Sequence, residues 1–238
     1  MQIFYTPDIA TNPELPEEEA GHCIRVLRLG EGDEIVLTDG LGSFYKASIN
    51  RAHPKHCEVT ILENWKQPDL WNFKLHIAVA PTKNIDRMEW FIEKATEIGI
   101  NAITCLNCRF SERKEVKLAR LEKILVSAMK QSQKATLPVL EGMTDFKRFI
   151  ATPFEGRKFI AHCEEGEKPL LKHIYRPGEN ALILIGPEGD FSPEEIKQAQ
   201  EKGFEPISLG KSRLRTETAA LVACHTIHVL NQDNPDNK

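Results

Sequence analysis

The sequence predicts a β domain at residues 1–70 and an α/β domain at residues 73–232 that has a mostly parallel sheet. Before residue 70, short apolar runs are separated by turn signals, whereas from Phe73 onwards they alternate with amphipathic segments of helical length. Strands that are separated by helices form parallel sheets with helices on both faces. The chain of 238 residues is long enough for two modest domains, and the polar stretch 66–72, which contains Pro68, is the predicted linker.

Three strands are predicted in the first domain. The segments 34–38 and 44–49 flank Asp39-Gly40-Leu41-Gly42, which has the composition of a hairpin turn. A third strand is predicted within 56–65, where β-branched residues are frequent. Together these segments indicate a small antiparallel arrangement.

Strands and helices alternate in the second domain. The segment 84–99 places Ile85, Met88, Ile92 and Ala95 on one helical face, and Gly99 is suited to end that helix. A second amphipathic helix is predicted at 115–132, and an apolar final helix at about 217–230. Strands are predicted at 74–80, 100–106, 158–162, 181–186 and 206–210.

Composition excludes several protein classes. The apolar and charged fractions, 41% and 28%, are those of a globular protein. No apolar run approaches the roughly 20 residues that span a bilayer. The first residues have neither the basic nor the apolar region of a signal peptide, so a cytoplasmic protein is expected. The six cysteines are scattered, and the Cys105/Cys108 pair lacks two further zinc ligands, so reduced thiols and no metal are expected.

Two loops carry the strongest functional signal. The apolar run 181–185 ends at Gly186-Pro187-Glu188-Gly189, and Ser192-Pro193-Glu194-Glu195 then has the pattern of a helix start. The stretch 208–220 repeats this form and holds Lys211, Arg213, Arg215 and Glu217 between an apolar strand and an apolar helix. Ligands bind at the carboxyl edge of such sheets, so two loops of this kind predict a cleft rather than ordinary tight turns. Neither a dinucleotide fingerprint nor a P-loop is present.

Charge is distributed unevenly along the chain. The net charge is −4, but residues 109–134 hold eight Lys or Arg and three Glu. This basic segment is suited to a phosphate backbone. Charge alone favours the alternative interpretation, a solvated helix face, because most charged runs are of that kind.

At the two loops the sequence resembles the RsmE family of SPOUT RNA methyltransferases. The resemblance rests on LILIGPEGDFSPEE followed by SLGKSRLRTETAA. It extends to APTKNIDRMEWFIEKATEIGI, to the basic segment, and to HCIRVLRLGEGDEIVLTDGLGSFYKASI near the N-terminus. Most of the chain is therefore covered in the order that the family has.

The resemblance implies a PUA-like β-barrel followed by a SPOUT domain with a deep trefoil knot, a rare exception to unknotted topology. It further implies S-adenosylmethionine as methyl donor, N3-methyluridine in the decoding region of 16S ribosomal RNA as product, and a homodimer with its active site at the subunit interface. Backbone groups of three loops would bind the donor. The expected donor-binding residues are Gly186, Gly189, Leu209, Gly210 and Leu214.

Methyl transfer to N3 requires that the base leaves its stack and that N3 loses its proton. Arg215 is the candidate for stabilising the charge that develops on the base. Glu217 or Glu188 is a candidate for orienting the base or accepting the proton, although a carboxylate at position 217 also suits a helix N-terminus. The predicted RNA-binding residues are all basic: Arg25, Arg28, Lys83, Arg109, Arg113, Lys117 and Arg213.

The chain departs from the family pattern at a few positions. Asp190 stands where the family usually has a second glycine, Lys130 where it has a glutamate, and Lys134 where it has an arginine. Three other interpretations stay open. In the first, the protein binds RNA through its PUA-like domain and is not catalytic. In the second, it is a SPOUT methyltransferase that acts on another RNA, such as transfer RNA. In the third, it is an unrelated nucleotide-binding enzyme.

Overall fold

The computed structural model describes residues 2–232, which form two compact units. The first unit comprises the chain up to Asp69 together with Val126–Leu137, and the second comprises Leu70–Leu125 and the residues from Pro138 onwards. The first unit therefore includes a stretch that lies inside the α/β part of the sequence. Within the described residues, no helix is both long enough and apolar enough to cross a membrane.

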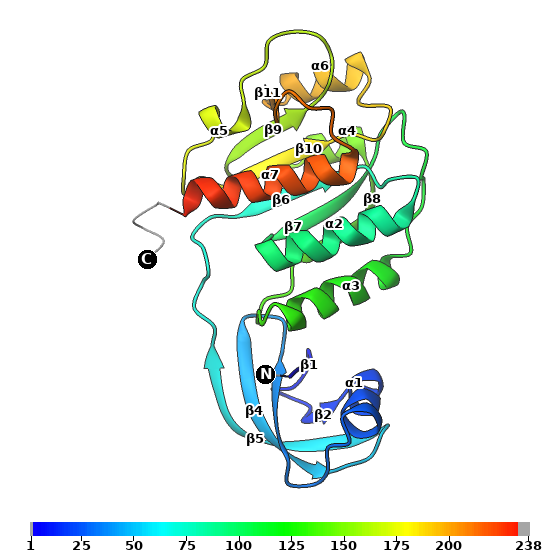
Figure 1. Cartoon of the computed structure of the whole chain (residues 1–238), viewed down its shortest axis with the longest axis vertical. Coiled ribbons are helices and arrows are strands. Elements are labelled where there is room, and N and C mark those ends of the chain that lie inside the picture. The colour runs from blue at the N-terminus through cyan, green and yellow to red at the C-terminus, as the bar shows by residue number, and fades with distance from the viewer. Residues whose placement is uncertain (1, 233–238) are drawn as a thin grey trace. The chain divides into compact units, whose positions relative to one another are not determined.

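The first unit is built on a mixed five-stranded sheet with the strand order β1-β3-β4-β5-β2 (Figure 1). β1 pairs in parallel with β3, and all other pairs are antiparallel. Two bulges interrupt the pairing of β4 with β5, and both strands curve strongly. The three predicted strands are present. The strands are β1 (Ile3–Tyr5), β2 (Glu14–Leu15), β3 (Glu34–Thr38), β4 (Ser43–Arg51) and β5 (Cys57–Lys66).

The turn between β3 and β4 is held by the side chain of Asp39. Its Oδ1 accepts hydrogen bonds from the backbone N–H groups of Leu41 and Ser43, at 2.8 and 3.1 Å. Gly40 and Gly42 have φ values of 75° and 105°, which glycine adopts at little cost. The turn signal in the sequence is thus confirmed. Two short helices that the sequence analysis did not predict, α1 (Glu17–Gly21) and the π-helix η1 (His22–Val26), pack beside this sheet.

The second unit contains a six-stranded sheet in which every pair is parallel, with the strand order β11-β9-β10-β6-β7-β8. The predicted parallel sheet is therefore confirmed. The deep knot that the resemblance implies stays a prediction. The strands are β6 (Leu75–Val79), β7 (Ala102–Asn107), β8 (Val139–Asp145), β9 (Arg157–Ala161), β10 (Ala181–Ile185) and β11 (Glu205–Ile207).

Helices cover both faces of this sheet (Figure 1). α7 packs on β6, on β10 and against α2, whereas α4 and α6 pack together on the other face. β10 is buried along its whole length because it lies between these layers. The helices are α2 (Ile85–Ile98), α3 (Leu118–Gln131), α4 (Phe146–Ile150), α5 (Leu171–Ile174), α6 (Pro193–Glu201) and α7 (Thr216–Asn231).

Two helix predictions differ in outcome. Gly99 ends α2 with a φ of 135°, as the sequence predicts. The predicted start of the second helix at residue 115 is wrong, because α3 begins at Leu118. Side chains before that point are engaged elsewhere. Arg113 donates hydrogen bonds to the carbonyl oxygens of Thr82 and Lys83, and Lys114 donates to that of Cys108, which holds this stretch outside the helix.

Candidate functional site

The loop that follows β10, residues 186–192 (the β10 loop), is closed by its own polar groups. Asp190 has a φ of 65°, the left-handed conformation that glycine adopts freely and that aspartate tolerates better than most residues. Its backbone N–H donates to the carbonyl oxygen of Pro187 at 2.9 Å. Its carboxylate accepts from the backbone N–H groups of Phe191 and Cys163, at 2.9 and 2.7 Å. Asp190 thus takes the glycine position of the family pattern and ties the β10 loop to the loop after β9.

The end of the β10 loop is fixed by the first turn of α6. Ser192 caps the helix, and its backbone N–H and hydroxyl donate to Oε2 of Glu195, which completes the capping box that the sequence predicts. The other carboxylate oxygen of Glu195 accepts the backbone N–H of Arg109 at 2.8 Å. At the start of the loop, the Thr216 hydroxyl donates to the carbonyl oxygen of Gly186 at 3.1 Å.

The loop that follows β11, residues 208–215 (the β11 loop), is more open. Within the loop, the hydrogen bonds are those of a single turn. The Ser208 hydroxyl accepts the N–H of Gly210 and donates to the carbonyl oxygen of Gly210, both at 3.2 Å. Gly210 has a φ of 132°, and a Cβ atom added there would have no neighbour within 4 Å. The basic side chains and Ser212 are exposed, whereas Leu209 and Leu214 are half-buried.

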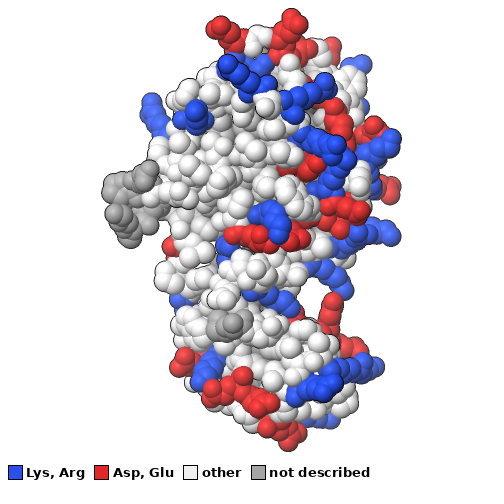
Figure 2. Space-filling view, viewed as in Figure 1, with Lys and Arg blue, Asp and Glu red and all other residues white. Residues whose placement is uncertain are grey.

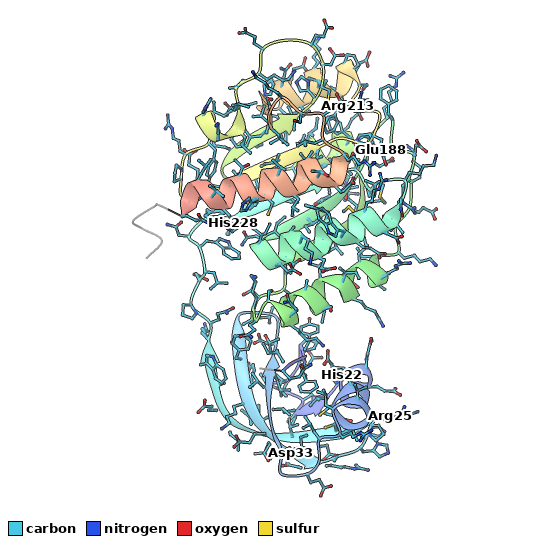
Figure 3. All side chains as sticks on the ribbon, in the orientation of Figure 1. His22, Arg25, Asp33, Glu188, Arg213 and His228 are labelled. Atoms are coloured by element: carbon cyan, nitrogen blue, oxygen red, sulfur yellow. The ribbon has the colours of Figure 1, made fainter. Side chains whose placement is uncertain are left out.

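The β10 loop, the β11 loop and the loop after β9, residues 162–170 (the β9 loop), border a cavity of about 790 Å³ at the carboxyl edge of the sheet. This volume is in the range of sites that enclose small organic ligands. All five predicted donor-binding residues line it: Gly186, Gly189, Leu209, Gly210 and Leu214. Glu188, Arg213 and Arg215 line it too, and Figure 3 shows Glu188 and Arg213 near the N-terminal end of α7.

The third candidate for catalysis has a different position. Glu217 is not among the residues that line the cavity, and it is 7% exposed. Its Oε1 lies 3.9 Å from Nε of Arg87 on α2. The carboxylate therefore lies at the packed side of the α7 N-terminus. Glu188, in contrast, is exposed, and its Oε1 accepts the backbone N–H of Lys83 at 3.0 Å.

The sequence analysis includes the β9 loop among the three donor-binding loops but selects none of its residues. His162, Cys163 and Lys168 border the cavity. Within the described chain, neither ring nitrogen of His162 has a hydrogen-bond partner, although both are buried. Burial, helped by the charge of Lys168, lowers the pKa of the His162 imidazole. The end of the strand predicted at 158–162 was the available signal, because that strand ends at the same edge of the sheet as β10.

The predicted RNA-binding residues fall into three places. Lys83, Arg109, Arg113 and Lys117 belong to neighbouring segments of the second unit, and Arg113 joins two of them through the hydrogen bonds to Thr82 and Lys83. Arg213 lies at the cavity. Arg25 and Arg28 belong to the first unit, where both are exposed and Arg28 has a φ of 58°.

Several basic residues have acidic neighbours. Nζ of Lys83 lies 2.7 Å from Oε2 of Glu112, and a guanidinium nitrogen of Arg109 lies 3.7 Å from Glu194. These pairs are exposed, so each contributes little to stability and can exchange for a phosphate. Figure 2 shows blue and red side chains mixed along this side of the second unit, whereas the surface over α7 is nearly uncharged.

The Cys105/Cys108 pair is buried at the end of β7. Burial raises the pKa of the Cys105 thiol to about 12 and also raises that of Cys108. Thiols in this environment stay protonated at neutral pH and are poor ligands and nucleophiles.

Two family models match the chain. One describes an RNA methyltransferase domain and matches residues 69–228. The other describes an RNA methyltransferase PUA domain and matches residues 15–62. The two matches cover the α/β part and the β-rich part of the sequence in turn.

The chain is also similar to individual proteins of bacteria. A ribosomal RNA small subunit methyltransferase E from Rickettsia conorii is 29% identical over 96% of this chain and 95% of its own length. The crystal structure of a probable rRNA methyltransferase from Porphyromonas gingivalis has a TM-score of 0.92 and 46% identity, and the match covers 97% of this chain and 98% of the other. A ribosomal RNA small subunit methyltransferase E from Neisseria gonorrhoeae, bound to S-adenosyl methionine, has a TM-score of 0.85 and 28% identity over 97% and 98% of the two chains.

Proposed function

The chain belongs to the RNA methyltransferase domain family, and from this premise we propose that it methylates N3 of a uridine in the decoding region of 16S ribosomal RNA. It is an S-adenosylmethionine-dependent ribosomal RNA methyltransferase. The observation that carries the proposal is the cavity at the carboxyl edge of the sheet, because it combines donor-sized space with Glu188 and Arg215.

The residues present fit the donor. Gly210 lines the cavity, a Cβ atom there would meet open space, and its φ of 132° means that a side chain would bring backbone strain. Gly186, Gly189, Leu209 and Leu214 bring further backbone groups and apolar surface to the same cavity. His162 adds a buried imidazole whose two nitrogens need partners. S-adenosylmethionine supplies an electrophilic methyl group when bound, and these residues would hold and orient it.

Arg215 and Glu188 would act on the base. Arg215 is exposed at the N-terminal end of α7, where its guanidinium can favour the negative charge that develops on the uracil carbonyl oxygens when N3 is deprotonated. Glu188 is held by the Lys83 N–H and lines the cavity, so it is better placed than Glu217 to orient the base or to accept the N3 proton. We assign to Glu217 the role of fixing the α7 N-terminus next to Arg87.

RNA would bind through phosphates to the basic residues of both units. Arg109 and Lys83 are exposed beside the β10 loop, Lys117 is exposed just before α3, and Arg213 lines the cavity. Arg25 and Arg28 would add phosphate contacts from the PUA domain, residues 1–70. Contacts of this kind set the orientation of the RNA and carry little sequence information.

A homodimer is the proposed assembly. α7 buries Ala220, Ala223 and Ile227 within the unit, while Val222 is half-buried and Val229 is 43% exposed. The nearly uncharged surface over α7 would be covered by a second copy (Figure 2). Light scattering should give twice the chain mass of 27.0 kDa, and Val222→Glu should give a monomer with a large loss of activity. A fully active monomer would contradict the assembly. Because the substrate is ribosomal RNA, the proposed location is the cytoplasm.

The test of the proposed function is methylation mapping by mass spectrometry of ribosomal RNA from cells with and without this protein. One N3-methyluridine in the decoding region should disappear with the protein, and purified protein should restore it to RNA from the deficient cells. Loss of a methyl group from transfer RNA instead would support the alternative substrate. No methyl transfer to any RNA would support a non-catalytic RNA-binding role.

A further inference from the structure

We propose that Phe110 is the stacking surface for the target base, an inference that rests on the proposed function. Phe110 lies in the loop between β7 and α3, and 46% of it is exposed. Bases that leave a nucleic-acid stack are received on aromatic side chains, because a flat apolar ring replaces the stacking that the base has lost. An exposed phenylalanine beside a methyl-transfer cavity meets this requirement.

The backbone around Phe110 is held rigidly. The backbone N–H of Cys108 donates to the Ser111 hydroxyl at 3.0 Å, and the N–H of Ser111 donates to the Cys108 carbonyl oxygen at 3.1 Å, which closes a tight turn. Ser111 and Cys108 are buried, so this turn is anchored. The N–H of Arg109 is bound to Glu195 of α6. The ring is thus exposed on an ordered support rather than on a loose loop.

This turn lies directly against the donor-binding loop. A Cβ atom added to Gly189 would come within 3.2 Å of the Phe110 Cβ and 3.9 Å of its carbonyl oxygen. Gly189 and Glu188 both line the cavity, so Phe110 stands on the outer side of the same loop segment. The close approach also gives a reason for glycine at 189, since a side chain there would displace the Phe110 turn.

Charge beside the ring favours a nucleotide over other apolar occupants. The Arg109 guanidinium lies 5.8 Å from the ring centroid, Arg113 is in the same loop as Phe110 and donates to the Lys83 carbonyl oxygen, and the Lys83 N–H donates to Glu188. A base on Phe110 would place its phosphates near these cations. A second copy of the chain would instead favour a surface depleted in charge, and such a surface lies over α7.

The test is a series at position 110 that separates an aromatic face from apolar volume. Phe110→Tyr retains the ring, Phe110→Leu retains apolar packing without a π face, and Phe110→Ala removes both. Under single-turnover conditions with saturating RNA and donor, Tyr should methylate at nearly the wild-type rate. Leu and Ala should be slower by about 10- to 100-fold, the range expected for loss of one base stack. Calorimetry should give unchanged S-adenosylmethionine affinity for all three.

A second measurement uses RNA with an abasic site in place of the target uridine. Phe110→Leu should weaken binding of the uridine RNA but not of the abasic RNA, because only the former has a base to stack. Equal losses for both RNAs, or a Leu variant with the wild-type rate, would overturn the inference. Product mapping with the wild-type protein tests the proposed function separately. If another nucleotide is methylated, the proposed function fails and the series is read at that nucleotide.

Discussion

The β10 loop and the β11 loop border one cavity, but the β10 loop is bound to other segments along its length, whereas the middle of the β11 loop is not. In the β10 loop, Asp190, Glu188 and Gly186 all bind backbone or side-chain groups of other segments. In the β11 loop, Ser208 pairs through its backbone with Pro169 and Leu171, whereas among the described residues the hydrogen bonds of 209–214 are limited to those between Gly210 and the Ser208 hydroxyl. Arg213 and Arg215 extend from this loop into solvent.

The difference indicates that the two loops have different roles. A loop whose hydrogen bonds are already made loses little conformational entropy when a ligand binds, so the β10 loop is suited to preorganise the donor site. Exposed arginines on an open loop can adapt to a nucleic-acid backbone and to the charge that develops during reaction. The β11 loop is therefore suited to contact the RNA, and Gly210 in this loop leaves space for S-adenosylmethionine to enter the cavity.

The largest effect should come from Gly210→Val in the β11 loop. A β-branched residue is strongly disfavoured at a φ of 132°, and it would add bulk at a position that lines the cavity. We expect calorimetry to detect no S-adenosylmethionine binding in a variant that stays folded, although the strain should lower its unfolding temperature. Gly166→Val is the matched control, because Gly166 has a φ of 124° and equally open surroundings but does not line the cavity. If both variants lose S-adenosylmethionine binding equally, backbone strain rather than obstruction of the cavity is the cause of the loss.

Next in size is Arg215→Ala. Loss of one group that stabilises developing charge typically slows an enzyme about 10²- to 10³-fold. We expect this loss in the single-turnover rate at saturating RNA, with donor affinity changed less than about twofold. Arg213→Ala should mainly raise the Kd for RNA and leave the saturating rate within about threefold, since a phosphate contact acts on binding. Normal turnover by Arg215→Ala would remove this arginine from the catalytic residues.

Asp190→Ala tests the rigid loop and should have a moderate effect. Alanine removes the acceptor for the N–H groups of Cys163 and Phe191 and is strained at a φ of 65°. The Phe191 N–H is partly buried, and a buried hydrogen-bond donor that loses its acceptor costs about 1–3 kcal/mol, so the Kd for S-adenosylmethionine should rise about tenfold. Asp190→Asn retains an oxygen acceptor and tolerates the left-handed conformation, so calorimetry should find it within about threefold of wild type. An Asn variant as weak as Ala would mean that charge, not loop closure, matters at 190.

Local sequence signals account for much of this site. The capping box at Ser192 and Glu195, the break at Gly99 and the buried run of β10 each depend on residues close in the chain, and each is confirmed. Contacts between distant segments could not be predicted. The bond from Arg109 to Glu195 and that from Asp190 to Cys163 depend on how strands far apart in sequence become neighbours. β8 was missed because its residues are half-buried without a clean alternation.

The smallest effect concerns the basic segment beside the β10 loop. Arg113 binds the carbonyl oxygens of Thr82 and Lys83, so its replacement would disturb the loop as well as remove a charge. Arg109 and Lys117 are exposed, and Arg109→Ala with Lys117→Ala isolates the charge. If both side chains contact single-stranded phosphates, the slope of log K against log salt should flatten by up to about 1.4, which is about 0.7 for each contact.

The control removes the same charge at the opposite edge of the sheet. Lys74 immediately precedes β6, and Arg176 lies in the segment that leads to β10; both are exposed. Lys74→Ala with Arg176→Ala should leave the salt slope unchanged, because these cations lie away from the proposed RNA path. Filter binding of the RNA at several salt concentrations measures both slopes. Equal flattening of the slope in the two double variants would mean that net charge governs RNA affinity. In that case the RNA would follow no phosphate path beside the β10 loop.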